Sequence, residues 1–247
     1  MKPLLLASGM RRGGSTLQFQ ILGDILRASG VCFESKYVDE LEGADLAPGP
    51  DGIVRVVKTH AVPKEAVNSG AGHMQCFHIY RDPRDALVSY LAKYESAYTD
   101  ERASRFLRMI QAEFNYWRSI EGIYSVRYED VVTALPDEVA RCARAMGADL
   151  GPDEIGRIAE SRSLESQKRR IKEVDWGAES TIRNGQDLID PETQLHSNHI
   201  RTGGCGAWQQ ELNKSGAAFI EANFGDWIEE LGYPLVTSRW QRWRHRI

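Results

Sequence analysis

Short runs of aliphatic and β-branched residues alternate with longer segments of helical period, and this rhythm limits the folds open to the chain more than any other feature. Strands that alternate with helices predict a parallel sheet whose crossover helices cover its faces. The fold class is therefore α/β. The expected strands are residues 4–8, 31–34, 52–58, 74–80 and 123–128.

Helices are expected between and after these strands. From about residue 163 to 207 the pattern weakens into polar, glycine and charged residues, and so long a stretch in a compact domain is more often functional than a linker. We expect a lid or acceptor-binding segment at 163–207, within a single domain of residues 1–247. The helical segments are 16–28, 84–93, 102–120, 136–146, 153–161 and 217–231.

Composition narrows the class of protein. A formal net charge of -4 argues against a nucleic-acid partner, and no apolar run approaches the roughly 18 to 20 residues that span a membrane. The four cysteines stand singly without C-x-x-C spacing, so neither a zinc site nor a disulfide framework is expected. We therefore expect a cytoplasmic protein without a membrane span, and the sequence leaves its oligomeric state open.

The first strand runs into a glycine-rich turn that is followed by a helix. Backbone amides of such a turn, together with the positive end of the helix dipole, suit a phosphate or sulfate. Gly9 and Gly14 keep the glycine spacing of a Walker loop, but Ser15 stands where its lysine belongs and the basic residue is Arg12. This departure argues against a magnesium-dependent NTPase, and a purely structural turn is the alternative.

The expected strand 52–58 delivers Lys58 and, two residues later, His60. Side chains two apart in extended backbone point the same way, so an ammonium and an imidazole can share one cleft. Transfer of a charged group needs a base for the acceptor proton and cations for the oxygen that gains charge. The alternative for His60 alone is a solvated or capping residue.

Arg81 ends the fourth expected strand, and Ser89 lies one to two turns into the helix that begins near Pro83. An arginine and a hydroxyl in this arrangement can converge on one phosphate, although a salt-bridged helix cap is the alternative. Tyr128 closes the last expected strand. All these residues fall at the carboxyl ends of parallel strands, the edge at which open α/β sheets bind ligands.

Taken together, the motifs resemble the PAPS-dependent sulfotransferase superfamily, in particular its cytosolic branch; PAPS is 3′-phosphoadenosine 5′-phosphosulfate. The segment 12–16 looks like the family's 5′-phosphosulfate loop, and Lys58-Thr59-His60 is similar to its K-[ST]-H string. Arg81 and Ser89 match the 3′-phosphate motif with its separation of eight residues. Tyr128 opens a YED string, and residues 200–208 look like the R-K-G-x-x-G-x-W segment.

The resemblance implies a P-loop NTPase-like sulfotransferase fold, PAPS as the donor substrate, no metal, and a small-molecule or carbohydrate acceptor. It also implies that His60 is the general base and that Lys58 and Arg12 stabilise the transferring group. The nucleotide-binding residues that it implies are Arg11, Arg12, Gly13, Gly14, Ser15, Thr16, Arg81, Ser89, Tyr128, Arg201, Thr202 and Gly203.

The chain departs from the family pattern at several positions. Gly13 replaces a serine of the loop, Thr202 replaces a lysine and Ala207 an aspartate. Leu17 stands where many members have a tryptophan that stacks on adenine, so other apolar or aromatic groups must hold that base. The dimerisation string of some members is not recognisable.

Several alternatives stay open. A P-loop kinase or a non-catalytic nucleotide-binding protein would also explain parts of the pattern. Glu34, at the end of the second expected strand, is a second candidate base, ranked below His60. The acceptor group can be an alcohol, a phenol, a sugar or an amine. The basic, tryptophan-bearing tail 239–246 is expected to combine packed aromatic rings with solvated charges, or else to contact an acidic acceptor or an anionic surface.

Overall fold

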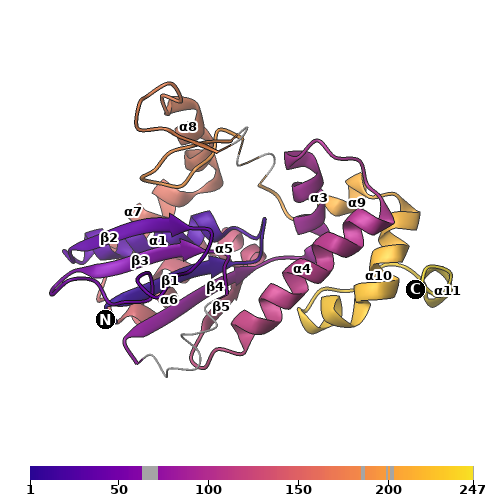
Figure 1. The fold of residues 1–247 in the computed structure, drawn as a ribbon, viewed down its shortest axis with the longest axis horizontal. Helices are drawn as coiled ribbons and strands as arrows, with labels where there is room; N and C mark the ends of the chain where they lie inside the picture. Colours follow the sequence, from indigo (N-terminus) through magenta and orange to yellow (C-terminus); the bar gives the residue numbers. More distant parts are fainter. Residues whose placement is uncertain (63–71, 185–186, 199, 201–202, 247) are drawn as a thin grey trace.

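Five parallel strands form the central sheet of the computed structural model, which describes residues 1–62, 72–184, 187–198, 200 and 203–246. The strand order is β2-β3-β1-β4-β5 (Figure 1), which confirms the predicted α/β class. The central strand β1 is buried along its whole length, in agreement with its mostly apolar sequence. The strands are β1 (Leu4–Gly9), β2 (Phe33–Val38), β3 (Val54–Thr59), β4 (Met74–Tyr80) and β5 (Tyr124–Arg127).

Helices cover both faces of this sheet. Alternate residues of β1 face opposite sides, so Leu5 packs with the helices of one core cluster while Leu4 and Leu6 pack with Trp117 of α4 in another. The first cluster is formed with α1 (Ser15–Ala28), α5 (Tyr128–Thr133), α6 (Leu135–Met146) and α7 (Pro152–Arg162).

A group of helices extends the molecule beyond the carboxyl ends of the strands (Figure 1). It shares a core cluster in which Leu87, Phe106 and Ile220 are almost fully buried. The helix α3 begins as expected at a proline, and Asp82 caps it by accepting from the amide of Arg84 at 2.9 Å. The members are α3 (Pro83–Lys93), α4 (Asp100–Arg118), α9 (Trp208–Glu211) and α10 (Lys214–Glu230). The short helix α11 (Arg239–Trp243) follows them and has no buried residue.

The stretch 163–207 is more regular than its sequence suggested. It begins with the helix α8 (Leu164–Glu173), and a hairpin of β6 (Ile182–Asn184) and β7 (Asp187–Ile189) follows. Sequence periodicity missed α8 because most of its residues are charged or polar and few are buried. In Figure 1, α8 stands above the sheet, whereas α3 lies beyond the end of the sheet at the right.

Several predicted strand boundaries were wrong; the third strand, for example, starts at Val54 and not at residue 52. The second strand starts at Phe33, not at residue 31, because the amide of Val31 is used to close α1 on the carbonyl of Leu26. It then runs to Val38, since an edge strand keeps pairing with β3 although its residues are polar. Tyr128 does not end β5 but begins α5, where two acidic residues favour the helix start.

Among the residues that the structure describes, no helix has both the length and the apolarity needed to cross a membrane.

Candidate functional site

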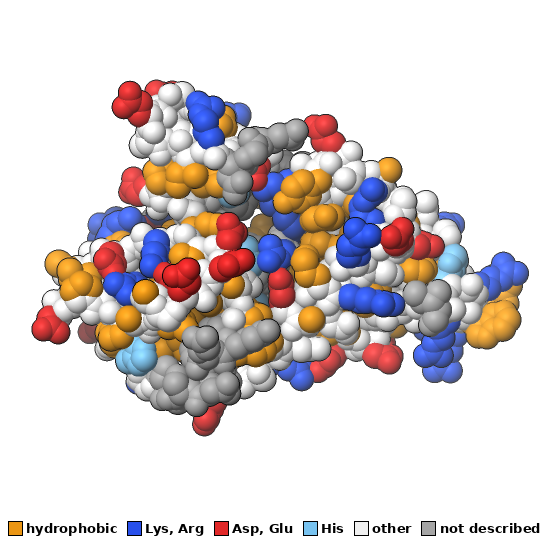
Figure 2. Space-filling view, viewed as in Figure 1, with side chains coloured by type: hydrophobic (Ala, Val, Ile, Leu, Met, Phe, Trp, Pro, Cys, Tyr) orange, Lys and Arg blue, Asp and Glu red, His pale blue; other side chains and the backbone are white. Residues whose placement is uncertain are grey.

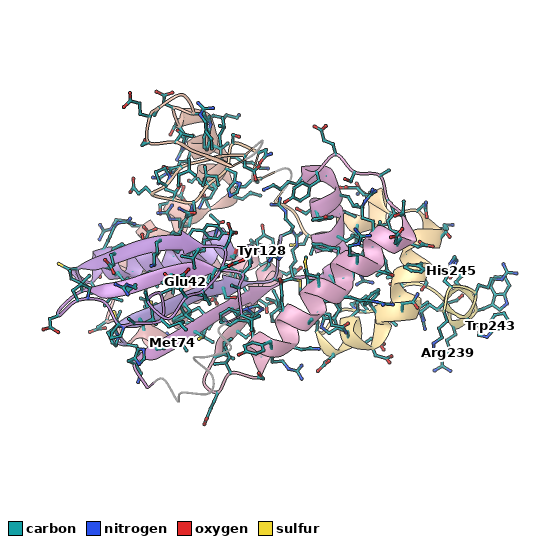
Figure 3. The ribbon with its side chains drawn as sticks, viewed as in Figure 1. Glu42, Met74, Tyr128, Arg239, Trp243 and His245 are labelled. Carbon is teal, nitrogen blue, oxygen red and sulfur yellow. The ribbon has the colours of Figure 1, made fainter. Side chains whose placement is uncertain are left out.

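A cavity of about 770 Å³ lies at the carboxyl ends of the strands, large enough for a nucleotide and a small acceptor. Its lining comes from the β1–α1 loop, the ends of β3 and β4, α3, α5, α8, the β6–β7 region and the segment near residue 203. Figure 2 shows the surface hollowed between the lobe that carries α8 and the lobe that carries α3. Tyr128, labelled in Figure 3, lies at the end of the sheet nearest these helices.

The β1–α1 loop has a backbone that only particular residues allow. Gly14 has a φ of 98°, and a methyl group on it would lie 2.6 Å from Cδ2 of Tyr128, so the ring packs directly on the loop. Arg12 adopts a left-handed φ of 65° without being glycine. The loop is thus held in one conformation by Tyr128, the first residue of α5.

The start of α1 faces the cavity through Ser15 and Thr16. The N-cap residue Gly14 supplies no side-chain acceptor for the first-turn amides, which makes a bound anion their natural partner. Gly13 differs from its neighbours, because its amide donates to the carbonyl of Met10 at 2.7 Å and the residue is not part of the lining. Its role is to shape the turn.

The two arginines of the loop reach different partners. Arg12 donates from Nε to Oγ of Ser89 on α3 at 3.1 Å, and burial is the main cause that lowers its pKa. Arg11 forms an ion pair with Glu113 of α4, with 3.0 Å between Nε and Oε1. The loop is therefore tied to the helices on the far side of the cavity, and Arg12 joins the loop to the residue predicted to bind the 3′-phosphate.

Lys58 is buried at the end of β3, with 4% of its surface exposed. Its ammonium lies 5.0 Å from the ring centroid of Tyr37. Burial, and then the charges of Lys93 and Arg12, lower its pKa to about 7. An anion that enters the cavity would be attracted by this cation and would in turn stabilise its charged form.

His60 follows β3 and lines the same cavity, and its Nδ1 lies 2.8 Å from the carbonyl oxygen of Gly9. A carbonyl only accepts, so Nδ1 carries the proton and Nε2 carries the lone pair. Burial, and then the charges of Lys58 and Arg11, lower the pKa of His60 to about 3. The imidazole is neutral near pH 7, and Nε2 is the atom that can take a proton.

Arg81 and Tyr128 hold the segment that closes the cavity. Arg81 donates to the carbonyl of Gly204 at 2.9 Å, and the Tyr128 hydroxyl donates to the carbonyl of Gly203 at 3.0 Å. The guanidinium lies 4.8 Å from the Tyr128 ring centroid and 3.3 Å from the carboxylate of Asp85. Arg81, directly after β4, and Tyr128, at the start of α5, thus fix a segment that is far away in the sequence.

An apolar end of the cavity lies beyond the loop. Because Leu17 lacks the flat ring of a tryptophan, neighbouring apolar side chains must supply the surface on which a base can pack. The apolar residues that line this end are Leu17, Val132, Leu135, Pro136 and Leu164.

The structure brings together nearly all the predicted site residues that it describes. Gly13 is the exception, and Arg201 and Thr202 lie outside the described residues. The predicted second base is wrong in its placement, because Glu34 lies near the amino end of β2, pairs with Arg55 at 2.5 Å and is not part of the lining. The residues that line the cavity as predicted are Arg11, Arg12, Gly14, Ser15, Thr16, Lys58, His60, Arg81, Ser89, Tyr128 and Gly203.

Sequence reasoning missed a polar cluster of the lining formed by Lys93, Asp187 and His196. Lys93 follows Ser89 by one helical turn, and this spacing could have indicated that it faces the same cavity. No comparable signal marked Asp187 or His196. Within the described part of the chain, no group of three or more His, Cys, Asp or Glu side chains could hold a metal ion.

The sheet, the glycine-rich loop and the cations around the cavity define an α/β protein with a cation-lined cavity at the carboxyl edge of its sheet, the edge at which such sheets bind ligands. Residues 53–232 match the sulfotransferase domain family. This match spans well over half of the chain, so the chain belongs to that family and is a PAPS-dependent sulfotransferase. No curated protein matches the sequence significantly.

Solved structures support the fold. The chain is similar to retinol dehydratase in complex with androsterone and the inactive cofactor PAP, with 18% identity over 97% of this chain and 84% of that one and a TM-score of 0.62. It is also similar to the mouse sulfotransferase SULT7A1 complexed with PAP, with 15% identity over 93% and 88% of the two chains and a TM-score of 0.59.

Proposed function

We propose that this enzyme transfers the sulfuryl group of PAPS to a hydroxyl or amine of a small-molecule or carbohydrate acceptor by in-line displacement at sulfur. The observation that carries the proposal is that His60, Lys58 and Arg12 line one cavity, with the lone pair of the imidazole on Nε2. A base and two cations are the groups that such a transfer requires.

The donor is held from both ends in this proposal. The first-turn amides of α1, with Ser15 and Thr16, bind the 5′-phosphosulfate at the helix N-terminus. Arg81 and Ser89 bind the 3′-phosphate, and Tyr128 and Gly203 border the nucleotide. Arg201 and Thr202, assigned to the same clamp by family resemblance, are outside the described residues. The apolar end of the cavity takes the adenine.

The chemical step then follows from the protonation states. Nε2 of His60 accepts the proton of the acceptor group as its oxygen or nitrogen forms a bond to sulfur. The bond from sulfur to the phosphate oxygen breaks at the same time, and 3′-phosphoadenosine 5′-phosphate (PAP) leaves. Lys58 and Arg12 stabilise the charge that develops on the departing oxygen and on the transferring group.

The relatives support a small-molecule acceptor, because two retinol dehydratase structures hold androsterone and retinol. A carbohydrate acceptor is part of the proposal as well. We also propose that residues 1–247 form a single domain in which 163–207 acts as a lid or acceptor-binding segment. The singly spaced cysteines argue for a cytoplasmic location.

The test measures PAP binding and sulfuryl transfer separately. PAP should raise the melting temperature without added magnesium, and at a hundredfold excess over its Kd it should add about 2.7 kcal/mol of stability. ATP with magnesium is the control ligand. Transfer of labelled sulfate from PAPS to a panel of acceptors should occur with the wild-type protein and be at least about a hundredfold slower with His60→Ala. Stabilisation by ATP with magnesium alone would favour a kinase instead.

A further inference from the structure

A charged cluster that takes no part in the proposed transfer lines the same cavity. Lys93 comes from α3, whereas Asp187 starts β7 and His196 follows that strand. The Lys93 ammonium donates to Oδ2 of Asp187 at 2.6 Å, and Nδ1 of His196 lies 3.3 Å from the same oxygen. The three side chains are only 10%, 19% and 16% exposed, so they form one preorganised group.

This group lies within electrostatic reach of the reacting centre. Lys93 is one of the charges that lower the pKa of Lys58, and Lys58 is one of those that lower the pKa of His196. Asp187 acts on Arg12 in the opposite direction, because its charge raises the pKa that burial lowers. A molecule that contacts the cluster is therefore also near the cations assigned to the sulfuryl group.

The cluster is polar but carries no net charge near neutral pH. The ammonium of Lys93 and the carboxylate of Asp187 cancel, and burial, with the charge of Lys93, lowers the pKa of His196 to about 4. Tyr90 and Tyr94, with ring centroids 4.9 Å apart, line the cavity beside it. Paired charges beside aromatic rings favour a ligand with several hydroxyl groups and no charge of its own.

We propose that Lys93, Asp187 and His196 form an acceptor subsite for hydroxyl groups adjacent to the one that is sulfated. The acceptor is then an uncharged polyhydroxylated molecule, such as a sugar or a cyclitol. Asp187 accepts a hydrogen bond from one hydroxyl, and Lys93 donates to the same or the neighbouring hydroxyl. An acceptor with a single hydroxyl group would displace water from Lys93 and Asp187 without replacing the hydrogen bonds that the water made. Sites built to bind a hydroxyl group discriminate strongly against molecules that lack it. This assignment rests on the proposed function.

The experiment compares acceptors of matched ring size in the wild-type protein and in Asp187→Asn. The probes are myo-inositol and methyl β-glucopyranoside, with cyclohexanol as the monohydric counterpart. The wild-type kcat/KM for at least one polyhydroxylated probe should exceed that for cyclohexanol by about tenfold to a hundredfold. Asp187→Asn keeps the shape of the side chain and should lose most of this preference, mainly through KM. The readout is the ratio of the two kcat/KM values, because cyclohexanol lacks the neighbouring hydroxyl groups and should lose much less than the polyhydroxylated probes.

The matched control is Glu192→Gln, which removes a carboxylate from the same part of the chain. Glu192 is 69% exposed, lies 3.7 Å from Arg27 and is not part of the cavity lining, so its variant should keep the wild-type preference. Lys93→Gln is the second variant at the cluster, and it should lose the preference as Asp187→Asn does. If Asp187→Asn does not fold, Lys93→Gln provides the test of the subsite.

Three outcomes would overturn the subsite. One is a wild-type protein that turns over cyclohexanol as efficiently as every polyhydroxylated probe. Another is an equal loss for all probes in Asp187→Asn with PAP affinity intact, since that describes a structural role. The third is an unchanged preference in both cluster variants. Calorimetry on the PAP complex distinguishes a failure of the subsite from a failure of the proposed transfer. If myo-inositol binds to the wild-type complex and not to the Asp187→Asn complex, but no probe is turned over, the subsite is supported and the proposed transfer is contradicted.

Discussion

At the scale of single residues, burial sets the charge states of Lys58, near the end of β3, and of His60, which follows that strand. It keeps His60 neutral and brings the pKa of Lys58 to about 7, so neither group behaves as it would in water. Their juxtaposition reinforces this effect, since the charge of Lys58 also disfavours a proton on His60.

His60→Ala should bind PAP with nearly wild-type affinity but lose turnover by at least about a hundredfold on an unactivated alcohol, because the variant lacks the proton acceptor. Single-turnover transfer and PAP titrations measure the two effects. His245→Ala is the control, since His245 is not part of the cavity lining. Near-normal turnover of His60→Ala would remove the histidine from the mechanism.

The pH dependence should reflect Lys58. Its ammonium is charged below its pKa of about 7 and becomes neutral as the pH rises through that value. The kcat/KM for PAPS, which reports the enzyme before the donor binds, should therefore fall above about pH 7. Lys58→Arg stays charged and should lose this alkaline limb. His60, with a pKa of about 3, should add no acidic limb between about pH 5 and 7. If the kcat/KM of Lys58→Arg still falls above about pH 7, the fall is caused by another group and the assignment to Lys58 is wrong.

At the scale of elements, the contact between the β1–α1 loop and the start of α5 sets the shape of the anion site. Gly14→Ala should destabilise the protein by about 1–2 kcal/mol through its left-handed backbone, with a further cost because the new methyl group meets the Tyr128 ring. It should also weaken PAP binding. Thermal melts with and without PAP measure both effects.

Gly52→Ala is the matched control for Gly14→Ala. Gly52 also has a left-handed φ, of 78°, but a methyl group there meets nothing within 4 Å. This variant should show the backbone cost without any change in PAP affinity. An equal loss of affinity in both variants would mean that the packing of Tyr128 on the loop does not shape the anion site.

The elements also show where sequence reasoning succeeds. Parallel strands place their carboxyl ends at one edge, so the convergence of Lys58, His60 and Arg81 on one cavity was predictable. The position of Glu34 was not, because an edge strand with polar residues has no clear period and its limits depend on pairing with β3. Asp187 and His196 were also beyond prediction, since β7 has three residues and their partner Lys93 is far away in the sequence.

At the scale of the whole molecule, Arg84 of α3 holds together the helices that extend beyond the carboxyl ends of the strands, because it joins α3 to α9 and α10. It is 1% exposed, and its guanidinium contacts Asp82 at 2.7 Å and Glu221 of α10 at 2.6 Å while it lies over Trp208. Removal of one partner from such a buried network leaves carboxylates without compensation.

Arg84→Ala should therefore lower the free energy of unfolding by about 3–5 kcal/mol in urea titrations. Arg105→Ala is the control, because its ion pair with Glu101 joins side chains that are 79% and 83% exposed, and its loss should cost less than about 0.5 kcal/mol. Similar unfolding midpoints for the two variants would show that these helices do not depend on Arg84.

The tail lies at the end of the molecule farthest from the sheet, where Figure 3 labels Arg239, Trp243 and His245. The expectation of packed aromatic rings was wrong, because Trp240 and Trp243 are 60% and 73% exposed. The guanidinium of Arg244 lies 3.8 Å from the Trp240 ring centroid, so part of this surface is covered by the tail itself.

The strand order has a consequence for the growing chain on the ribosome. The first strand to be made, β1, occupies the centre of the sheet, and its two neighbours β3 and β4 end by residue 80. All strands of the large sheet are complete at residue 127, so the sheet can assemble during synthesis while much of the chain is still to come. Gly203 and Gly204, the partners of Tyr128 and Arg81, are made only after the whole of this sheet. We therefore expect a nascent chain to form this sheet before the segment that Tyr128 and Arg81 hold is available to it.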